Sequence, residues 1–213
     1  MSANAPEGPP RRVVGIGASA GGVDALVRLV RHLPADLPAA VCVVLHVPAT
    51  ARSLLALILG RHSELPVEVA EHGAPLLAGR VYVAPPDSHL TVAGGRLCLD
   101  HGPKENAARP AVDPLLRSLA TEYGALAVGV ILSGALGDGS SGALAIHQAG
   151  GTIIVQDPRE ALVPSMPESA LRAVGAAAAP LEPEAIGERL AAIAHAGQEM
   201  RDDVPMTPAE ADS

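Results

Sequence analysis

An apolar stretch that runs into a glycine-rich turn, residues 13–22 (VVGIGASAGG), constrains the fold more than any other segment of the chain. Its first residues favour a short buried strand, and its glycines favour a tight turn because they lack the Cβ atoms that would crowd it. Apolar residues at Val23, Leu26 and Val30 then follow the period of a helix. The segment therefore predicts a strand, a tight turn with Ser19 at its tip, and a helix.

The alternation of strand and helix continues along the chain. Continuous apolar runs favour strands that are covered on both faces, as in parallel sheets. Strands are predicted at residues 12–16, 40–46, 67–70, 80–84, 126–133 and 151–156, with a hairpin at 89–99 around Gly94-Gly95. Helices are predicted at 22–32, 51–61, 113–123, 139–149, 167–174 and 183–196. This order predicts an α/β fold: a doubly wound, mostly parallel sheet with helices on both faces and one antiparallel hairpin.

Length and composition limit the domain organisation and the function class. The 213 residues suffice for one sizeable domain, expected at 12–197, with a disordered lead at 1–11 and a disordered acidic tail at 198–213. A net charge of −8 and an aromatic content of 1% disfavour nucleic-acid binding, which needs basic surfaces and stacking side chains. No apolar run reaches the roughly 18 residues that span a bilayer. We therefore expect a cytoplasmic protein with no membrane insertion.

Three polar residues follow predicted strands. Ser19 follows the first strand, His46 ends the second, and Asp138 follows the strand predicted at 126–133. Ligands bind at the carboxyl ends of strands in doubly wound sheets, so we expect the three side chains along one edge. Ser19 also fits the G-x-S-x-G pattern of a nucleophile elbow. A serine hydroxyl needs a base, and the base needs an orienting acceptor, which are roles that His46 and Asp138 could fill.

The glycine turn also allows other interpretations. Gly15, Gly17 and Ala20 fit the G-x-G-x-x-G/A fingerprint of dinucleotide-binding folds. That fingerprint expects an acid at the end of the second strand, where this chain has His46. The turn could equally be purely structural, and Asp138 could be no more than the N-cap of the following helix. On the residues alone, hydrolysis, nucleotide binding and a structural turn all remain open.

Six separated motifs occur in an order that is typical of one family. They are IGASAGG at 16–22, LHVP at 45–48, VYVAPPDSHL at 81–90, RPAVDPLL at 109–116, VGVILSGALGDGSSG at 128–142, and Met166-Pro167. Together they resemble the catalytic domain of the CheB-type chemotaxis protein-glutamate methylesterases, from about residue 12 to about residue 196. The resemblance implies hydrolysis of glutamate γ-methyl esters on chemoreceptors, and in some members deamidation of receptor glutamines. The family's triad falls on Ser19, His46 and Asp138.

The resemblance also implies how the site is completed. It implies no metal and no organic cofactor, and we expect oxyanion-binding or substrate-binding positions at Ala20, Gly134, Ala135 and Arg109. The family often has threonine where this chain has Ala20, and commonly reads GMGxDG where this chain reads GALGDG at 134–139. Expected partners are methylated cytoplasmic helices of chemoreceptors or receptor-like signalling proteins.

Regulation is the remaining expectation. Many family members carry an N-terminal phosphoacceptor receiver domain that covers the active site, whereas the first strand predicted here begins at Arg12. We therefore expect a stand-alone catalytic domain that is constitutively active or controlled by a separate regulator in trans. The alternative is a catalytically silent or non-motility signalling scaffold of the same fold, which the intact serine, histidine and aspartate disfavour.

Overall fold

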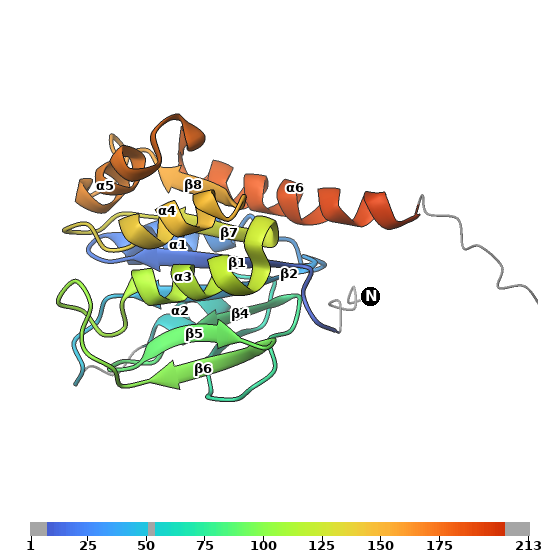
Figure 1. Ribbon diagram of the computed structural model, residues 1–213, viewed down its shortest axis with the longest axis horizontal. Helices are drawn as coiled ribbons and strands as arrows, with labels where there is room; N and C mark the ends of the chain where they lie inside the picture. The colour runs from blue at the N-terminus through green and yellow to red at the C-terminus, as the bar shows by residue number, and fades with distance from the viewer. Residues whose placement is uncertain (1–7, 51–53, 203–213) are drawn as a thin grey trace, which may run out of the picture.

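A seven-stranded parallel sheet forms the centre of the molecule (Figure 1). The computed structural model describes residues 8–50 and 54–202. The strand order is β3-β4-β2-β1-β7-β8-β9, and each neighbouring pair is parallel. These strands are β1 (Arg12–Ala18), β2 (Ala39–Leu45), β3 (Val67–Val69), β4 (Arg80–Val83), β7 (Ala127–Ile131), β8 (Thr152–Gln156) and β9 (Pro180–Leu181). The predicted doubly wound α/β class is thereby confirmed, with β9 as a short edge strand that the apolar pattern did not predict.

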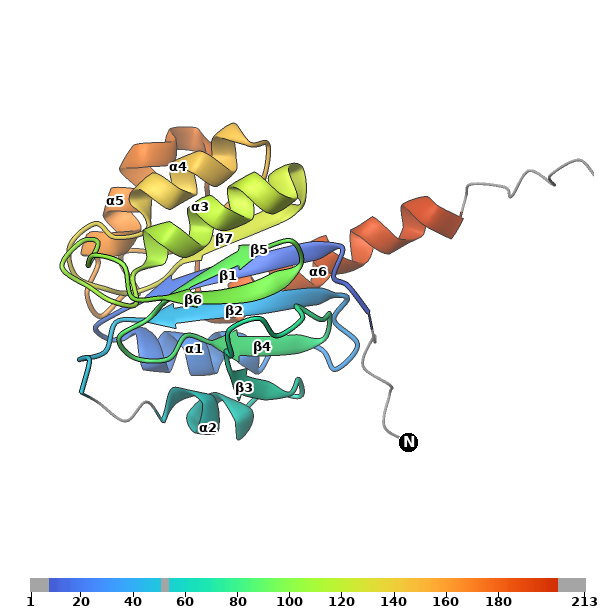
Figure 2. The ribbon, with the colours of Figure 1, turned by 60° about the horizontal axis from the view of Figure 1, so that its bottom comes forward.

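The predicted hairpin is also confirmed. Strands β5 (His89–Ala93) and β6 (Arg96–Asp100) pair antiparallel as a separate two-stranded sheet. Gly94 and Gly95 connect them with φ of 55° and 70°, the left-handed values that a tight two-residue hairpin turn requires. The hairpin lies beside the main sheet, packed on α3 (Figure 2).

Helices cover both faces of the sheet because successive strand residues point to opposite sides. Val13 and Val14 of β1, for example, belong to two different apolar clusters. One cluster is completed by α1 (Gly22–Val30), α2 (Leu55–Gly60) and α6 (Pro183–Asp202). The other is completed by α3 (Val112–Tyr123), α4 (Ser140–Gln148), α5 (Ser165–Val174) and the hairpin. Figure 2 shows these two helical layers on either side of the strands.

The topology creates a switch point between β1 and β7. From β1 the chain builds the sheet outward through β2, and it later returns to add β7 on the other side of β1. Crevices at such switch points, outside the carboxyl ends of the strands, are where doubly wound sheets bind ligands. A Cβ on Gly15 would lie only 2.7 Å from Leu116 of α3, so this glycine lets α3 pack closely on β1.

Both ends of the predicted domain need correction. Gly8 accepts a hydrogen bond on its carbonyl from the N–H of Ala78 (3.0 Å), and Pro10 is buried, so residues 8–11 belong to the folded body rather than to a disordered lead. Residues 1–7 lie outside the described residues. At the other end α6 continues through Asp202, beyond the predicted start of the tail at 198. Residues 198–202 contain no glycine or proline that would stop a helix.

Parts of two further predicted segments lie outside the described residues. Residues 203–213 of the predicted tail lie outside them, as do residues 51–53 of the predicted helix 51–61, whose described part begins at Leu55. None of the helices in the described part of the chain combines the length and apolar character needed to cross a bilayer.

Candidate active site

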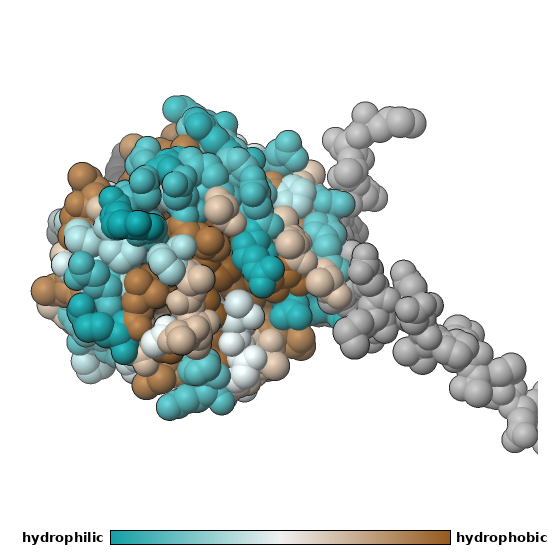
Figure 3. Space-filling view, turned by 90° about the horizontal axis from the view of Figure 1, so that it is seen from above, coloured by the Kyte–Doolittle hydropathy of each residue, from teal (hydrophilic) through white to brown (hydrophobic). Residues whose placement is uncertain are grey.

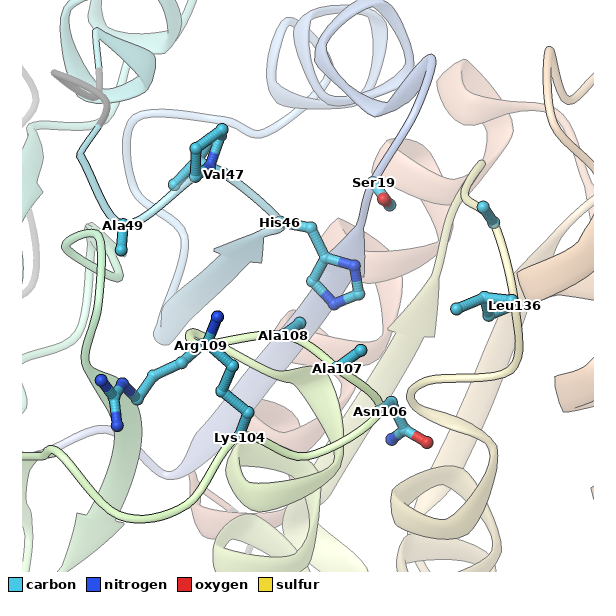
Figure 4. A pocket seen from close by; sticks show the side chains of 12 residues that line it. Ser19, His46, Val47, Ala49, Lys104, Asn106, Ala107, Ala108, Arg109 and Leu136 are labelled. Atoms are coloured by element: carbon cyan, nitrogen blue, oxygen red, sulfur yellow. The ribbon is translucent and has the colours of Figure 1, made fainter.

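Backbone hydrogen bonds that extend the parallel ladders bring the ends of β1, β2 and β7 together. The N–H of Ser19 donates to the carbonyl of Ser133 (2.9 Å), and the N–H of His46 donates to the carbonyl of Ala18 (3.1 Å). Ser19 therefore lies at the switch point, between the loop after β2 and the loop after β7. Figure 4 shows Ser19 and the ring of His46 lining one pocket at this edge, as the strand assignment predicted.

The turn that carries Ser19 is held in a tight conformation. Gly21 has φ of 76°, and a Cβ there would lie 2.6 Å from the Cβ of Leu162. The buried hydroxyl of Ser133 donates to the carbonyl of Ala20 (2.7 Å) and accepts from the N–H of Val163 (3.0 Å). Ser133 thus fixes the turn to the loop after β8, a role that no sequence motif indicated.

His46 and Asp138 form a short, directed hydrogen bond. Nε2 of His46 lies 2.6 Å from Oδ2 of Asp138, and Asp138 is fully buried while the histidine side chain is 18% exposed. Because an ionised carboxylate only accepts hydrogen bonds, Nε2 carries the proton and donates. In the neutral ring, the other nitrogen, Nδ1, is then free to accept a proton. In the common serine-protease template the two nitrogens have the opposite roles, yet either one can act as a base.

The surroundings of Asp138 keep it ionised. Burial alone would raise its pKa, but the hydrogen bond from His46 and those from the N–H groups of Val112 (2.7 Å) and Asp113 (3.1 Å) outweigh burial and lower the pKa. Both N–H groups belong to the first turn of α3, where the helix dipole favours negative charge. The prediction that Asp138 is the N-cap of the following helix is wrong: Gly139 is the N-cap of α4, and Asp138 instead accepts N–H groups at the start of α3.

Asn106, which is exposed, and Asp113, which is buried, complete this polar group, and sequence reasoning did not single out either. Nδ2 of Asn106 donates to Oδ1 of Asp138 and to Oδ2 of Asp113, both at 2.9 Å. Oδ1 of Asp113 accepts the N–H of Gly142 in α4 (2.7 Å). Burial raises the pKa of Asp113, and the neighbouring Asp138 raises it further. Asp113 does lie within the RPAVDPLL motif, but its contact with Asp138 depends on the fold.

The cavity in front of Ser19, called here the Ser19 pocket, has a volume of about 360 Å³. Its floor is polar and much of its rim is apolar. The lining residues are Ser19, His46, Val47, Pro48, Ala49, Lys104, Asn106, Ala107, Ala108, Arg109, Ala135 and Leu136 (Figure 4). The described residues include no cluster of three or more His, Cys, Asp or Glu side chains that could hold a metal ion. The pocket is large enough for an ester-bearing side chain.

Three residues expected to bind the oxyanion or the substrate, Ala20, Gly134 and Ala135, have different surroundings in the structure. Ala20 is exposed beside Ser19, and Ala135 lines the Ser19 pocket. Gly134 needs correction as a donor, because its N–H already donates to the carbonyl of Val163 (2.9 Å). A Cβ on Gly134 would lie 2.8 Å from the Cβ of Ser19, so this glycine provides space beside the serine.

Arg109 lines the Ser19 pocket, but its guanidinium holds the surrounding loop together. Nε and Nη2 donate to Oδ1 of Asp87, at 3.0 and 2.7 Å. Nη1 donates to the carbonyls of His101 and Gly102, at 2.9 and 2.7 Å. Nε, Nη1 and Nη2 therefore all have partners within the protein, and a role of Arg109 in oxyanion or substrate binding stays a prediction. Exposed Lys104 is the other cation that lines the pocket.

A serine and a histidine at the carboxyl edge of a parallel α/β sheet, with the histidine bonded to a buried aspartate, are the arrangement of a serine-hydrolase site. The chain belongs to the CheB methylesterase family, whose pattern matches residues 14–190. The resemblance inferred from the six motifs is thereby confirmed.

Similar proteins agree on the family. Protein-glutamate methylesterase/protein-glutamine glutaminase 2 of Xanthomonas oryzae pv. oryzae (strain MAFF 311018) is 42% identical over 186 residues, which are 85% of this chain and 51% of that protein. Protein-glutamate methylesterase/protein-glutamine glutaminase 3 of Anaeromyxobacter dehalogenans is 43% identical over 188 residues, which are 87% of this chain and 55% of that protein. The chain thus spans about half the length of the curated relatives it matches.

A solved structure agrees on the fold. The crystal structure of the Thermotoga maritima CheB methylesterase catalytic domain superposes with a TM-score of 0.81 at 36% identity. The match covers 85% of this chain and 98% of that chain.

Proposed function

We propose that this chain is a serine hydrolase that demethylates glutamate γ-methyl esters on chemoreceptors. The observation that carries the proposal is the 2.6 Å bond between His46 and buried Asp138, beside Ser19 in an open pocket. Deamidation of receptor glutamines is the second reaction, because an amide and an ester present the same side-chain acyl carbon. Relatives of the chain are named for both activities.

The mechanism starts with attack of the Ser19 hydroxyl on the ester carbonyl, while Nδ1 of His46 takes the hydroxyl proton. Asp138 keeps the ring oriented and stabilises its charged form. Collapse of the tetrahedral intermediate expels methanol, which receives the proton from His46. Water then attacks the glutamyl-serine ester with His46 again as base, releasing glutamate and free Ser19. The N–H of Ala20, in the turn between Ser19 and α1, is the proposed oxyanion donor.

The proposed partners are the methylated cytoplasmic helices of chemoreceptors, so the proposed compartment is the cytoplasm. Family membership supports this kind of partner in general. The partly exposed His46 and the open Ser19 pocket support it further, because a side chain projecting from a helix could reach them from solvent.

The test measures methanol release from methylated chemoreceptor cytoplasmic fragments by the wild type, Ser19→Ala and Ser141→Ala. Ser141 is an exposed serine on α4 and serves as the matched control. We expect release by the wild type and Ser141→Ala, and none by Ser19→Ala. Methanol release by Ser19→Ala at the wild-type rate would refute the assignment of the nucleophile. If the wild type releases no methanol and hydrolyses no 4-nitrophenyl acetate, the silent scaffold is the better interpretation.

A further inference from the structure

Leu136 has an unusual combination of backbone conformation and exposure. It lies between β7 and Asp138 with φ of 66°, in the left-handed region that disfavours residues with a Cβ, and its side chain is 67% exposed. A leucine that is both strained and exposed contributes little to the stability of the fold. A role in binding would explain why leucine occupies this position.

The side chain of Leu136 is directed at the Ser19 pocket. It lines the pocket together with Ala107 and Ala108 of the neighbouring loop, and Figure 4 shows it at the rim, pointing inward. Residues 47–49 supply further apolar rim on the side of His46. A side chain that enters to reach Ser19 must pass this rim.

Hydrophobic residues also reach the surface elsewhere at this end of the molecule. Figure 3 shows hydrophobic and hydrophilic residues intermingled on the face seen from above, and Leu162, in the loop after β8, is 80% exposed. A protein substrate that covers the pocket mouth would therefore meet apolar surface around the polar floor.

We propose that Leu136 is a specificity-determining residue, which contacts an apolar side chain of the receptor segment that presents the ester. The inference rests on the proposed function. On a helical substrate, the residues three or four positions from the modified glutamate lie on the same face. When the ester reaches Ser19, such a neighbour lies over the rim and covers Leu136. Because this contact is the same in the bound ground state and in the transition state, it lowers KM and leaves kcat unchanged.

The test compares Leu136→Ala, Leu136→Gly and the control Leu126→Ala. Leu126 is 44% exposed and lies in the turn before β7, at the opposite edge of the sheet. Both Leu136 variants should lower kcat/KM for the methylated receptor fragment by about tenfold, through KM, because a buried apolar contact is lost. The kcat/KM for 4-nitrophenyl acetate should fall by much less than the value for the receptor fragment, because the small ester has no neighbouring side chain that contacts Leu136. Leu126→Ala should resemble the wild type on both substrates.

Thermal unfolding distinguishes the effect of the Leu136 side chain from the effect of its backbone conformation. Leu136→Gly should melt at a higher temperature than Leu136→Ala, because glycine adopts the left-handed conformation without a Cβ penalty. A variant that is more stable and yet less active on the receptor fragment identifies a contact rather than a structural role.

Two results would overturn the inference about Leu136 alone. One is unchanged receptor kcat/KM in Leu136→Gly, and the other is an equal loss on the small ester, which would place Leu136 in support of the reacting groups. If the wild type releases no methanol from the receptor fragment but hydrolyses the small ester through Ser19, the proposed receptor substrate fails, and this inference fails with it.

Discussion

Nε2 is the ring nitrogen of His46 that contacts Asp138, and this decides what a change at Asp138 does. Nε2 donates to Oδ2 of Asp138, while Oδ1 of the same carboxylate accepts from Asn106, Asp113 and Gly139. Because the carboxylate is fully buried, water cannot replace Oδ1 as the acceptor for these three donors, and turning the side chain would break their hydrogen bonds. The side chain is therefore fixed in one orientation toward the histidine.

The variant Asp138→Asn should nearly abolish hydrolysis. Its amide oxygen would occupy the Oδ1 position, so its NH2 group would face Nε2 of His46 and shift the ring proton to Nδ1. Nδ1 could then no longer act as the base. We expect kcat for 4-nitrophenyl acetate to fall by about three to four orders of magnitude, with Asp36→Asn on the exposed surface as control. A loss below tenfold would contradict the proposed role of Asp138.

At the scale of elements, two aspartates connect α3 and α4. Asp138, in the loop before α4, accepts N–H groups of the first turn of α3, and Asp113 of α3 accepts the N–H of Gly142 in α4. Asp138 thus accepts hydrogen bonds from the N-terminus of α3, and Asp113 accepts one from the N-terminal turn of α4, where free N–H groups need acceptors. The position of the Asp138 carboxylate is a consequence of how these helices pack.

Asp113 makes this connection sensitive to pH. Burial raises its folded-state pKa, so the folded protein favours the protonated form. The stability that this raised pKa contributes is fully present below the unfolded value, about 3.9, and is lost as pH rises through the folded pKa. Asp113→Asn removes the titration. The melting temperature of Asp113→Asn relative to the wild type should therefore rise between pH 4 and pH 7, as measured by thermal unfolding. A difference that is constant with pH would contradict this account.

The elements were predictable from the sequence where a local pattern encodes them. Apolar runs indicated the central strands, and Gly94-Gly95 indicated the hairpin turn, because both signals lie within a few residues. The strand ends then placed Ser19, His46 and Asp138 at one edge. Asn106 and Ser133 were missed because their contacts join loops that are distant in sequence, 32 residues apart for Asn106 and Asp138. No periodicity records which loops a fold brings together.

At the scale of the whole molecule, the site faces solvent without a rearrangement. Ser19 and His46 are both partly exposed, and the Ser19 pocket in front of them is open. The groups that orient the histidine belong to the folded core, with Asp138 held by the first turn of α3. Accessibility and orientation, which a switch would have to supply, are therefore already present in this conformation.

This chain should consequently hydrolyse 4-nitrophenyl acetate without any phosphodonor. Addition of acetyl phosphate with Mg²⁺, which phosphorylates receiver domains, should leave the rate within about twofold, because the open pocket leaves little activity for a conformational step to release. Ser19→Ala serves as the blank for hydrolysis that does not depend on the site. A rise of tenfold or more with acetyl phosphate would show that most molecules in solution have a closed site. Such a population, about nine in ten, would contradict the expectation of constitutive activity.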